Sequence, residues 1–157
     1  ELEYMQAMQG KLLDILHHAD TSQLRSGAVH LDIWFDNLNI DGDNITLFDF
    51  DFCGNGWQCL DVAYYLMQLH FTEPDNTEFR RKMVAFLQGY ESITSLTTEE
   101  KRLLPALGTA LYFFYLGVQC QRFENYSSIF LSDTYLKRYI TMRVKRWADY
   151  CDANGLA

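Results

Sequence analysis

Apolar residues recur at the three- and four-residue spacing of helices along most of this chain, and short polar segments separate the apolar stretches. In the first stretch, Leu12, Leu13 and Leu16 follow this spacing, whereas residues 60–71 are apolar nearly all round, which predicts a central helix. The pattern predicts helices over residues 4–19, 60–71, 75–90 and 135–150, and one that follows Thr97 and extends to about Phe114.

Polar residues at the expected helix starts support these boundaries. Asp75-x-x-Glu78 and Thr97-x-x-Glu100 both resemble capping boxes, in which the side chain of the first residue accepts a hydrogen bond from the first turn. Pro105 lies inside the helix that follows Thr97, and proline lacks the backbone donor that a helix interior needs. We therefore expect a kink or a break in that helix.

One segment has the pattern of a hairpin instead of a helix. Residues 38–40 and 45–48 are two short apolar runs, and they flank Asp41-Gly42-Asp43-Asn44. Asp-Gly between two apolar runs is a strong signal for a tight turn between antiparallel strands. A hairpin of this length would return the chain to its starting point and bring Asp49 near Asn37.

The residues on either side of this hairpin have the chemistry that phosphoryl transfer needs. Transfer from a nucleotide requires an acceptor hydroxyl that is held in line, and divalent metal that neutralises the phosphates. Asp32 could accept the proton of the hydroxyl, while Asn37 and Asp49 offer the hard oxygen ligands that Mg2+ prefers. The bulky apolar insert at residues 33–35 would anchor the loop and leave its polar ends facing one cleft. The alternative is that these residues only form turns and caps, which Asp and Asn commonly do.

The order of these motifs resembles the family of aminoglycoside phosphotransferases and choline kinases, whose fold is similar to that of protein kinases. The resemblance covers residues 28–66, and its motifs are His30-x-Asp32-x-x-x-x-Asn37, the hairpin, Asp49-Phe50-Asp51, the glycine-containing turn Gly54-Asn55-Gly56-Trp57, and Asp61-Val62-Ala63 at the start of a helix. It implies a mainly α fold with a small β-hairpin, as in the C-terminal lobe of a protein-kinase-like α+β fold. It also implies site residues, namely Asp32 as catalytic base, Asn37, Asp49 and Asp51 as ligands of Mg2+, and His30 and Asp61 as supports of the catalytic loop.

Two departures from the family pattern accompany this match. Leu31 stands where the family usually carries a small residue, commonly glycine, so we expect a local difference in the backbone. Nothing before His30 resembles the nucleotide-binding lobe, with its glycine-rich flap and its strand lysine. We therefore expect residues 1–157 to form a single C-terminal catalytic and substrate lobe, which needs the N-terminal lobe of the same protein as a partner and is inactive in isolation.

Composition narrows the range of partners. The chain has 157 residues, of which 48% are hydrophobic, and this suffices for one domain with a real core. Its formal charge of -8 disfavours nucleic acid and mildly favours a cationic substrate, although solubility alone explains such a charge. The four cysteines show no zinc-site or disulfide spacing, and no stretch is expected to cross a membrane. Together with the lack of a signal peptide, this predicts a cytoplasmic protein.

Three functions fit the pattern to different degrees. The first is an ATP-dependent phosphotransferase that acts on a hydroxyl of an amino alcohol, sugar or aminoglycoside. The second is an inactive kinase-like binding or scaffold module, and the third is a metal-dependent phosphohydrolase, for which His30 alone supplies a nearby imidazole. Trp57 lies just beyond the metal loop and is a candidate for binding the substrate, since aromatic rings attract cations. The identity of the substrate is not encoded in these motifs.

Overall fold

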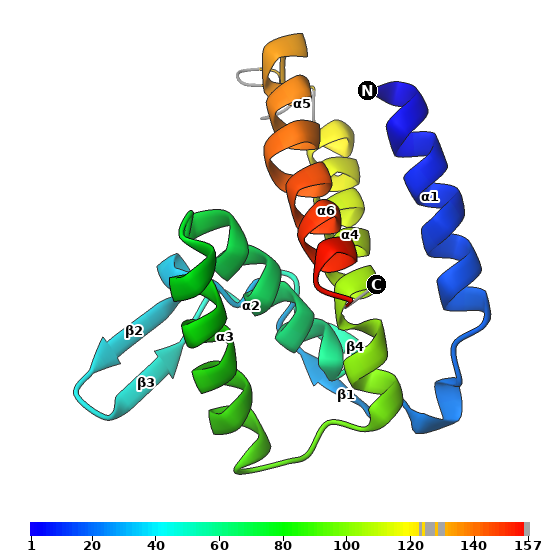
Figure 1. Ribbon diagram of the computed structural model, residues 1–157. Helices are drawn as coiled ribbons and strands as arrows, with labels where there is room; N and C mark the ends of the chain where they lie inside the picture. The colour runs from blue at the N-terminus through cyan, green and yellow to red at the C-terminus, as the bar shows by residue number, and fades with distance from the viewer. Residues whose placement is uncertain (123, 125–127, 129–130, 156–157) are drawn as a thin grey trace. The chain divides into compact units, whose positions relative to one another are not determined.

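The computed structural model describes residues 1–122, 124, 128 and 131–155, and these residues form two compact units. One unit comprises residues 20–104 and contains all the predicted site residues. The other unit comprises residues 1–19 and 105–157 and is helical in its described part. Mainly helical structure with small antiparallel sheets is therefore confirmed for the described residues (Figure 1).

The unit of residues 20–104 contains two small sheets and two full helices. Its elements are the strands β1 (Ser26–Val29), β2 (Leu38–Asp41), β3 (Asn44–Leu47) and β4 (Gly54–Trp57), and the helices α2 (Cys59–Thr72) and α3 (Asn76–Glu91). Most of α2 is buried, including Val62, Ala63 and Leu66, as expected for a central helix. The long helix α4 (Thr98–Gln121) begins in this unit and continues into the other.

The predicted hairpin is confirmed. β2 and β3 pair antiparallel, with Leu38 opposite Leu47 and Asp41 opposite Asn44, so each strand extends one residue farther into the turn than expected. Gly42 has a φ of 58°, in the left-handed region that glycine adopts without steric cost. The N–H of Phe48 donates to the carbonyl oxygen of Asn37, so the hairpin returns the chain to its starting point.

A second sheet replaces the expected glycine-containing turn at residues 54–57. These residues form β4, which pairs antiparallel with β1 in the register Ser26 opposite Trp57. A Cβ atom on Gly56 would lie 3.0 Å from Cγ2 of Val29 and 3.2 Å from Cδ1 of Leu60. The glycine therefore permits a close approach between β4, its partner strand and the start of α2. The sequence predicted only one hairpin, so the prediction missed this second sheet.

Both predicted helix starts are confirmed, and one of them is a full capping box. The N–H of Glu100 donates to Oγ1 of Thr97, and the N–H of Thr97 donates to Oε2 of Glu100. At the start of α3, the Asp75 side chain accepts from two backbone N–H groups, but its own N–H donates to Glu73 instead of Glu78. The capping box at Asp75 is therefore only half formed.

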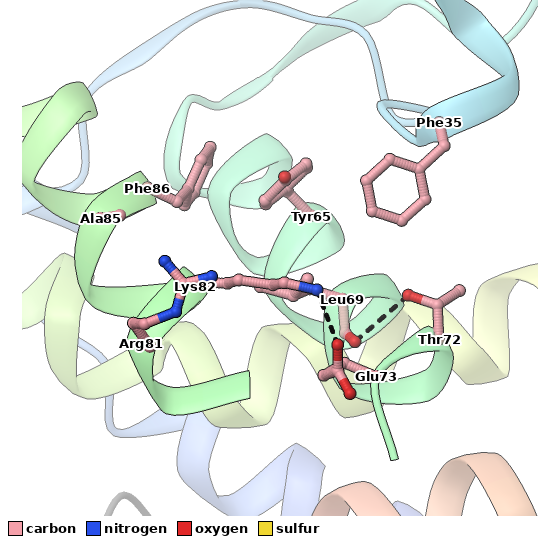
Figure 2. Close-up of a pocket in the computed structure, with 9 residues that line it drawn as sticks. All are labelled: Phe35, Tyr65, Leu69, Thr72, Glu73, Arg81, Lys82, Ala85 and Phe86. Atoms are coloured by element: carbon pink, nitrogen blue, oxygen red, sulfur yellow. Dashed lines mark hydrogen bonds and ion pairs between the residues drawn. The ribbon is translucent and has the colours of Figure 1, made fainter. Parts of the chain in front are cut away.

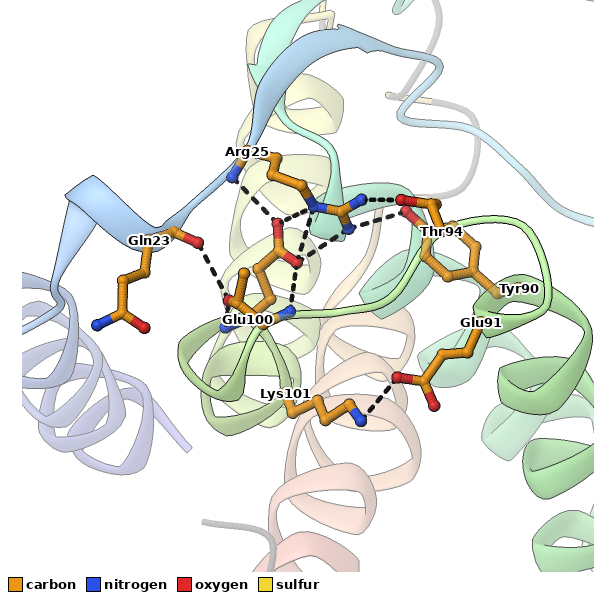
Figure 3. A network of polar contacts seen from close by, with 8 residues as sticks. Gln23, Arg25, Tyr90, Glu91, Thr94, Glu100 and Lys101 are labelled. Atoms are coloured by element: carbon orange, nitrogen blue, oxygen red, sulfur yellow. Dashed lines mark hydrogen bonds and ion pairs between the residues drawn. The ribbon is translucent and has the colours of Figure 1, made fainter.

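An ion pair between the partly buried Arg25 and the buried Glu100 holds the segment that leads into the predicted catalytic loop (Figure 3). The guanidinium of Arg25 forms three hydrogen bonds of 2.9 to 3.1 Å with the two oxygens of Glu100, whose side chain is fully buried. Arg25 also donates to Thr94 and Tyr90, while its carbonyl accepts from Gln58 at the start of α2. Burial raises the pKa of Glu100, but the hydrogen bonds outweigh it and hold this pKa below its usual value.

The other unit consists of α1 (Leu2–His17), the part of α4 from Pro105 onward, α5 (Asp133–Tyr139), a π-helical stretch (Ile140–Lys145) and α6 (Arg146–Ala153). Of the kink or break expected at Pro105, the break does not occur, since α4 continues through the proline. The proline leaves the carbonyl of Lys101, four residues earlier, without its backbone donor. The carbonyl of Pro105 itself accepts from Nε1 of Trp147 at 3.0 Å.

Helix α4 corrects the expectation that no stretch is long and apolar enough to cross a membrane. It has 24 residues, and its most apolar 18-residue window has a mean hydropathy of 1.4. Half of that window is buried inside the structure. A core helix of a globular protein meets the same criteria of length and hydropathy, so this helix carries no argument for a membrane.

Candidate functional site

The backbone of the predicted catalytic loop is held by a carboxylate from α2. The Asp61 side chain accepts hydrogen bonds of 2.8 Å from the N–H groups of both His30 and Leu31. Leu31 has a φ of 60°, a conformation that favours glycine and costs a larger side chain about 1–2 kcal/mol. The family's glycine at this position thus has a physical reason, and the two bonds to Asp61 help to retain the conformation with leucine in its place.

His30 links the two arms of the site. It is buried, and its Nδ1 accepts from the N–H of Asp32 at 3.3 Å, so Nε2 carries the ring proton and donates to the carbonyl of Phe48 at 3.1 Å. The ring also lies 4.7 Å from the ring of Phe50, measured between centroids. The imidazole therefore connects the loop at Asp32 with the segment that leads to Asp49.

Asp32 and Asn37 are in direct contact. Nδ2 of Asn37 donates to Oδ2 of Asp32 at 2.8 Å and to the carbonyl oxygen of Asp32 at 3.0 Å. Both of these partners are acceptors, so the amide nitrogen must face them. Oδ1 of Asn37 is then the amide atom that remains for a cation, and oxygen of this kind is a hard ligand of Mg2+.

Two residues near Asp32 were missed in the sequence. The hydroxyl of Tyr64 donates to Oδ1 of Asp32 at 2.6 Å, and Nε2 of Gln68 donates to the Tyr64 oxygen at 3.1 Å. Both come from α2, and with Asp61 they have the spacing i, i+3 and i+7 of one helix face. Once Asp61 was assigned to the loop, this spacing was the signal that could have identified them.

The predicted metal loop is exposed at Asp49 and Asp51, and Asp49 has a strained backbone. Its φ is 63°, and the described non-glycine residues with positive φ are Leu31 and Asp49, one on each side of the hairpin. Strained residues persist where the surrounding structure holds them and often occur at functional sites. Asp51 is also exposed. The roles of Asp49 and Asp51 as metal ligands stay predictions.

The donor set is compatible with Mg2+ but not with a metal held mainly by protein. Within the described ranges, no three His, Cys, Asp or Glu side chains gather as a set of metal ligands. Magnesium usually keeps several waters and takes one or two protein carboxylates together with phosphate oxygens. Asn37 and Asp49 therefore suffice in kind and in number.

A cavity of about 590 Å3 lies beside the loop and between α2 and α3 (Figure 2). The rings of Phe35, Tyr65 and Phe86 lie in a row on one side, with Tyr65 stacked on Phe86 at 4.1 Å between centroids. Glu73 and Lys82 form an ion pair of 2.6 Å on the opposite side. Its remaining described lining residues are Leu69, Thr72, Arg81 and Ala85.

Trp57 is not among the described lining residues of this cavity. It lies in β4 opposite Ser26 and is half-buried. Its role in binding a substrate stays a prediction. The cavity residues were not found from the sequence, because Glu73 and Lys82 come together only through the turn between α2 and α3.

A loop that is anchored from a helix and followed by a hairpin with carboxylates at its exit is the arrangement expected of a kinase-like phosphotransferase site. The model of the "Phosphotransferase enzyme family" matches residues 2–96, which is more than half of the chain. The chain belongs to this family.

Curated relatives of this chain include several enzymes named homoserine kinase. That of Rhodopseudomonas palustris (strain BisB18) is 41% identical over 104 residues, covering 64% of this chain and 32% of the relative. That of Sinorhizobium medicae is 40% identical over 94 residues, covering 58% and 28%. That of Rhizobium etli (strain CFN 42) is 37% identical over 118 residues, covering 71% and 36%. The chain thus spans about a third of the length of the curated relatives it matches.

Proposed function

We propose that this chain is the catalytic lobe of an ATP-dependent phosphotransferase that acts on the hydroxyl of a small amino acid or amino alcohol. The observation that carries the proposal is the fixed Asp32 carboxylate, which is bonded on one oxygen by Asn37 and on the other by Tyr64. Asp32 accepts the proton of the acceptor hydroxyl, as the catalytic base. His30 and Asp61 hold its loop in place through the hydrogen bonds described above.

Magnesium and ATP belong to this proposal. Asn37 and Asp49 would hold Mg2+, with Asp51 assisting, and the metal would neutralise charge on the phosphates of the nucleotide. An N-terminal lobe of the same protein would cover the adenine and the phosphates, so that residues 1–157 act as the C-terminal lobe. A cytoplasmic location, and the absence of nucleic-acid and membrane partners, stay predictions.

The lining of the cavity is compatible with an acceptor that carries both a negative and a positive group. Its volume lies in the range of small-molecule sites, and Phe35 places it three residues from Asp32 along the loop. Lys82 and Arg81 can pair with a carboxylate, and Glu73 with an ammonium group. Homoserine has a hydroxyl, an ammonium group and a carboxylate, and relatives at about 40% identity are named for its phosphorylation. We therefore propose homoserine or a close analogue as the acceptor.

A phosphotransfer assay on the protein at its full natural length tests the function. L-Homoserine, choline, a hexose and an aminoglycoside are each incubated with ATP and Mg2+, and ADP release is measured. We expect the highest kcat/KM with L-homoserine and a loss of about 100-fold or more in Asp32→Asn. Asp36→Asn is the matched control, because Asp36 is exposed on the same loop. Full turnover in Asp32→Asn would overturn the proposal, and nucleotide binding without turnover of any acceptor would favour the inactive binding module.

A second variant pair tests the cavity. Lys82→Met removes the cation from the 2.6 Å pair with Glu73, whereas Lys101→Met removes one from an equally short exposed pair with Glu91. We expect Lys82→Met to raise the KM for the acceptor about tenfold and to leave the KM for ATP unchanged. An equal effect of both variants would mean that the acceptor does not bind in this cavity.

A further inference from the structure

Tyr64 and Gln68 form a chain of hydrogen bonds that ends on the Asp32 carboxylate. A carboxylate only accepts, so the phenol must donate its proton to Oδ1 of Asp32, at 2.6 Å. The phenol oxygen in turn accepts from Nε2 of Gln68 at 3.1 Å, one helical turn farther along α2. The donation from Gln68 favours the hydroxyl orientation that points toward Asp32.

This chain of hydrogen bonds is rigid because Tyr64, its middle member, is buried. Tyr64 is 2% exposed and is one of the largest fully buried side chains, whereas Asp32 and Gln68 are half-buried. Hydrogen bonds in series polarise one another, so the donation from Gln68 strengthens the donation from Tyr64. The phenol therefore presents a fixed donor to one side of the carboxylate.

The two oxygens of Asp32 are bonded from different elements. Oδ2 receives the amide of Asn37 from the loop itself, and Oδ1 receives the phenol of Tyr64 from α2. Donors on both oxygens fix the rotation of the carboxylate plane. A carboxylate has about four lone-pair positions, so a donor on each oxygen does not by itself prevent it from accepting from a substrate hydroxyl.

We infer that Tyr64, supported by Gln68, is the positioning residue that orients the Asp32 carboxylate toward the acceptor hydroxyl, an inference that rests on the proposed role of Asp32 as base. In transfer through a loose transition state, the placement of the base matters more than its basicity. Helix α2 then positions both the loop that carries the base and the base itself. Asp61 holds the loop backbone, and Tyr64 holds the carboxylate of Asp32.

The test is a set of variants of the protein at its full natural length, assayed with ATP, Mg2+ and L-homoserine. Tyr64→Phe should lower kcat roughly 10- to 100-fold with little change in the KM for ATP. Gln68→Leu should lower kcat by about 2- to 5-fold, and should have no further effect in Tyr64→Phe, because Gln68 acts through the phenol. Tyr139→Phe is the matched control, since it removes a buried hydroxyl that donates at 2.7 Å to a carbonyl oxygen.

Equal kcat values for Tyr64→Phe and Tyr139→Phe, or fully additive effects of Tyr64→Phe and Gln68→Leu, would overturn the inference. A proton NMR spectrum separates its failure from that of the proposed function. The hydroxyl proton of Tyr64 should give a downfield signal that is lost in Tyr64→Phe, shifted in Asp32→Asn and retained in Tyr139→Phe. Absence of that signal in the unaltered protein overturns the inference even where Asp32→Asn is inactive, whereas an active Asp32→Asn overturns the proposed function.

Discussion

The exchange of Asp61 for asparagine tests how the catalytic loop is held. Asp61 accepts two backbone N–H groups, each at 2.8 Å, and hydrogen bonds to a charged group are worth about 1.5–3 kcal/mol each. Asparagine keeps one acceptor oxygen but turns an NH2 group toward the second N–H. One bond is therefore lost, and because Asp61 is only partly buried, we expect a cost of about 2 kcal/mol to the local stability of the loop.

Hydrogen exchange measures this local stability directly. Amides that are protected by local structure exchange through opening, and a loss of 2 kcal/mol corresponds to a roughly 30-fold higher opening constant. In Asp61→Asn, we expect faster exchange in the peptide that contains the amides of His30 and Leu31. Amides in α3 should exchange as in the unaltered protein. Asp36→Asn serves as the control, because it makes the same chemical change at an exposed position of the loop.

Unchanged exchange at residues 30 and 31 in Asp61→Asn would refute this reasoning. It would mean that the loop keeps its conformation through His30 and the strands alone. A uniform rise in exchange over the whole unit would also contradict it, because Asp61 would then stabilise the fold in general instead of the loop. Kinetic assays of both variants should show a lower kcat in Asp61→Asn, whose loop amides exchange faster, and an unchanged kcat in Asp36→Asn.

The remaining predictions concern strain, packing and pH. Leu31→Ile keeps size and hydrophobicity but adds a branch at Cβ, which is disfavoured at a φ of 60°, so chemical denaturation should show a loss of about 1–2 kcal/mol. Gly56→Ala should cost about 1–3 kcal/mol in the same assay because its Cβ would lie 3.0 Å from a valine methyl group, whereas Gly54→Ala, which meets open space, should be near neutral. Arg25→Met leaves the buried Glu100 charge unpaired and should lower the melting temperature at neutral pH, by the equivalent of about 3 kcal/mol. The folded-state pKa of Glu100 is lowered, so its contribution to stability is present above the unfolded value of 4.5 and is lost as pH falls through the folded-state pKa. Melting curves against pH should therefore show a smaller loss of stability in acid for Arg25→Met than for the unaltered protein, since other carboxyl groups with a lowered pKa, such as Glu99, remain in both.

Local sequence signals predicted the elements that depend on local chemistry. The Asp-Gly turn identified the β2–β3 hairpin, and the polar residues at 75 and 97 identified the starts of α3 and α4, because caps and tight turns depend on a few adjacent residues. The β1–β4 sheet was missed for the opposite reason. It joins residues 26–29 to 54–57, and Gly54-Asn55-Gly56-Trp57 has neither the alternation nor the β-branched residues that indicate a strand.

In the candidate site, too, the contacts between residues that are distant in the sequence could not be predicted. The spacing of Asp32, Asn37 and Asp49 could be read from the sequence because it matches the motifs of the resembled family, but the contacts that hold Asp32 and Asn37 depend on conformation. Position 31 stood out in the sequence only as a departure from the family's small residue, whereas the structure gives it a left-handed backbone at the point where Asp61 meets two consecutive N–H groups. Asp32, the following residue, contacts Tyr64, a residue whose sequence pattern indicates only a core helix. The strained backbone of Leu31 thus accompanies the contact between a buried hydroxyl and the proposed base, and the helix face of Asp61 and Tyr64 carries information that the motif alone does not.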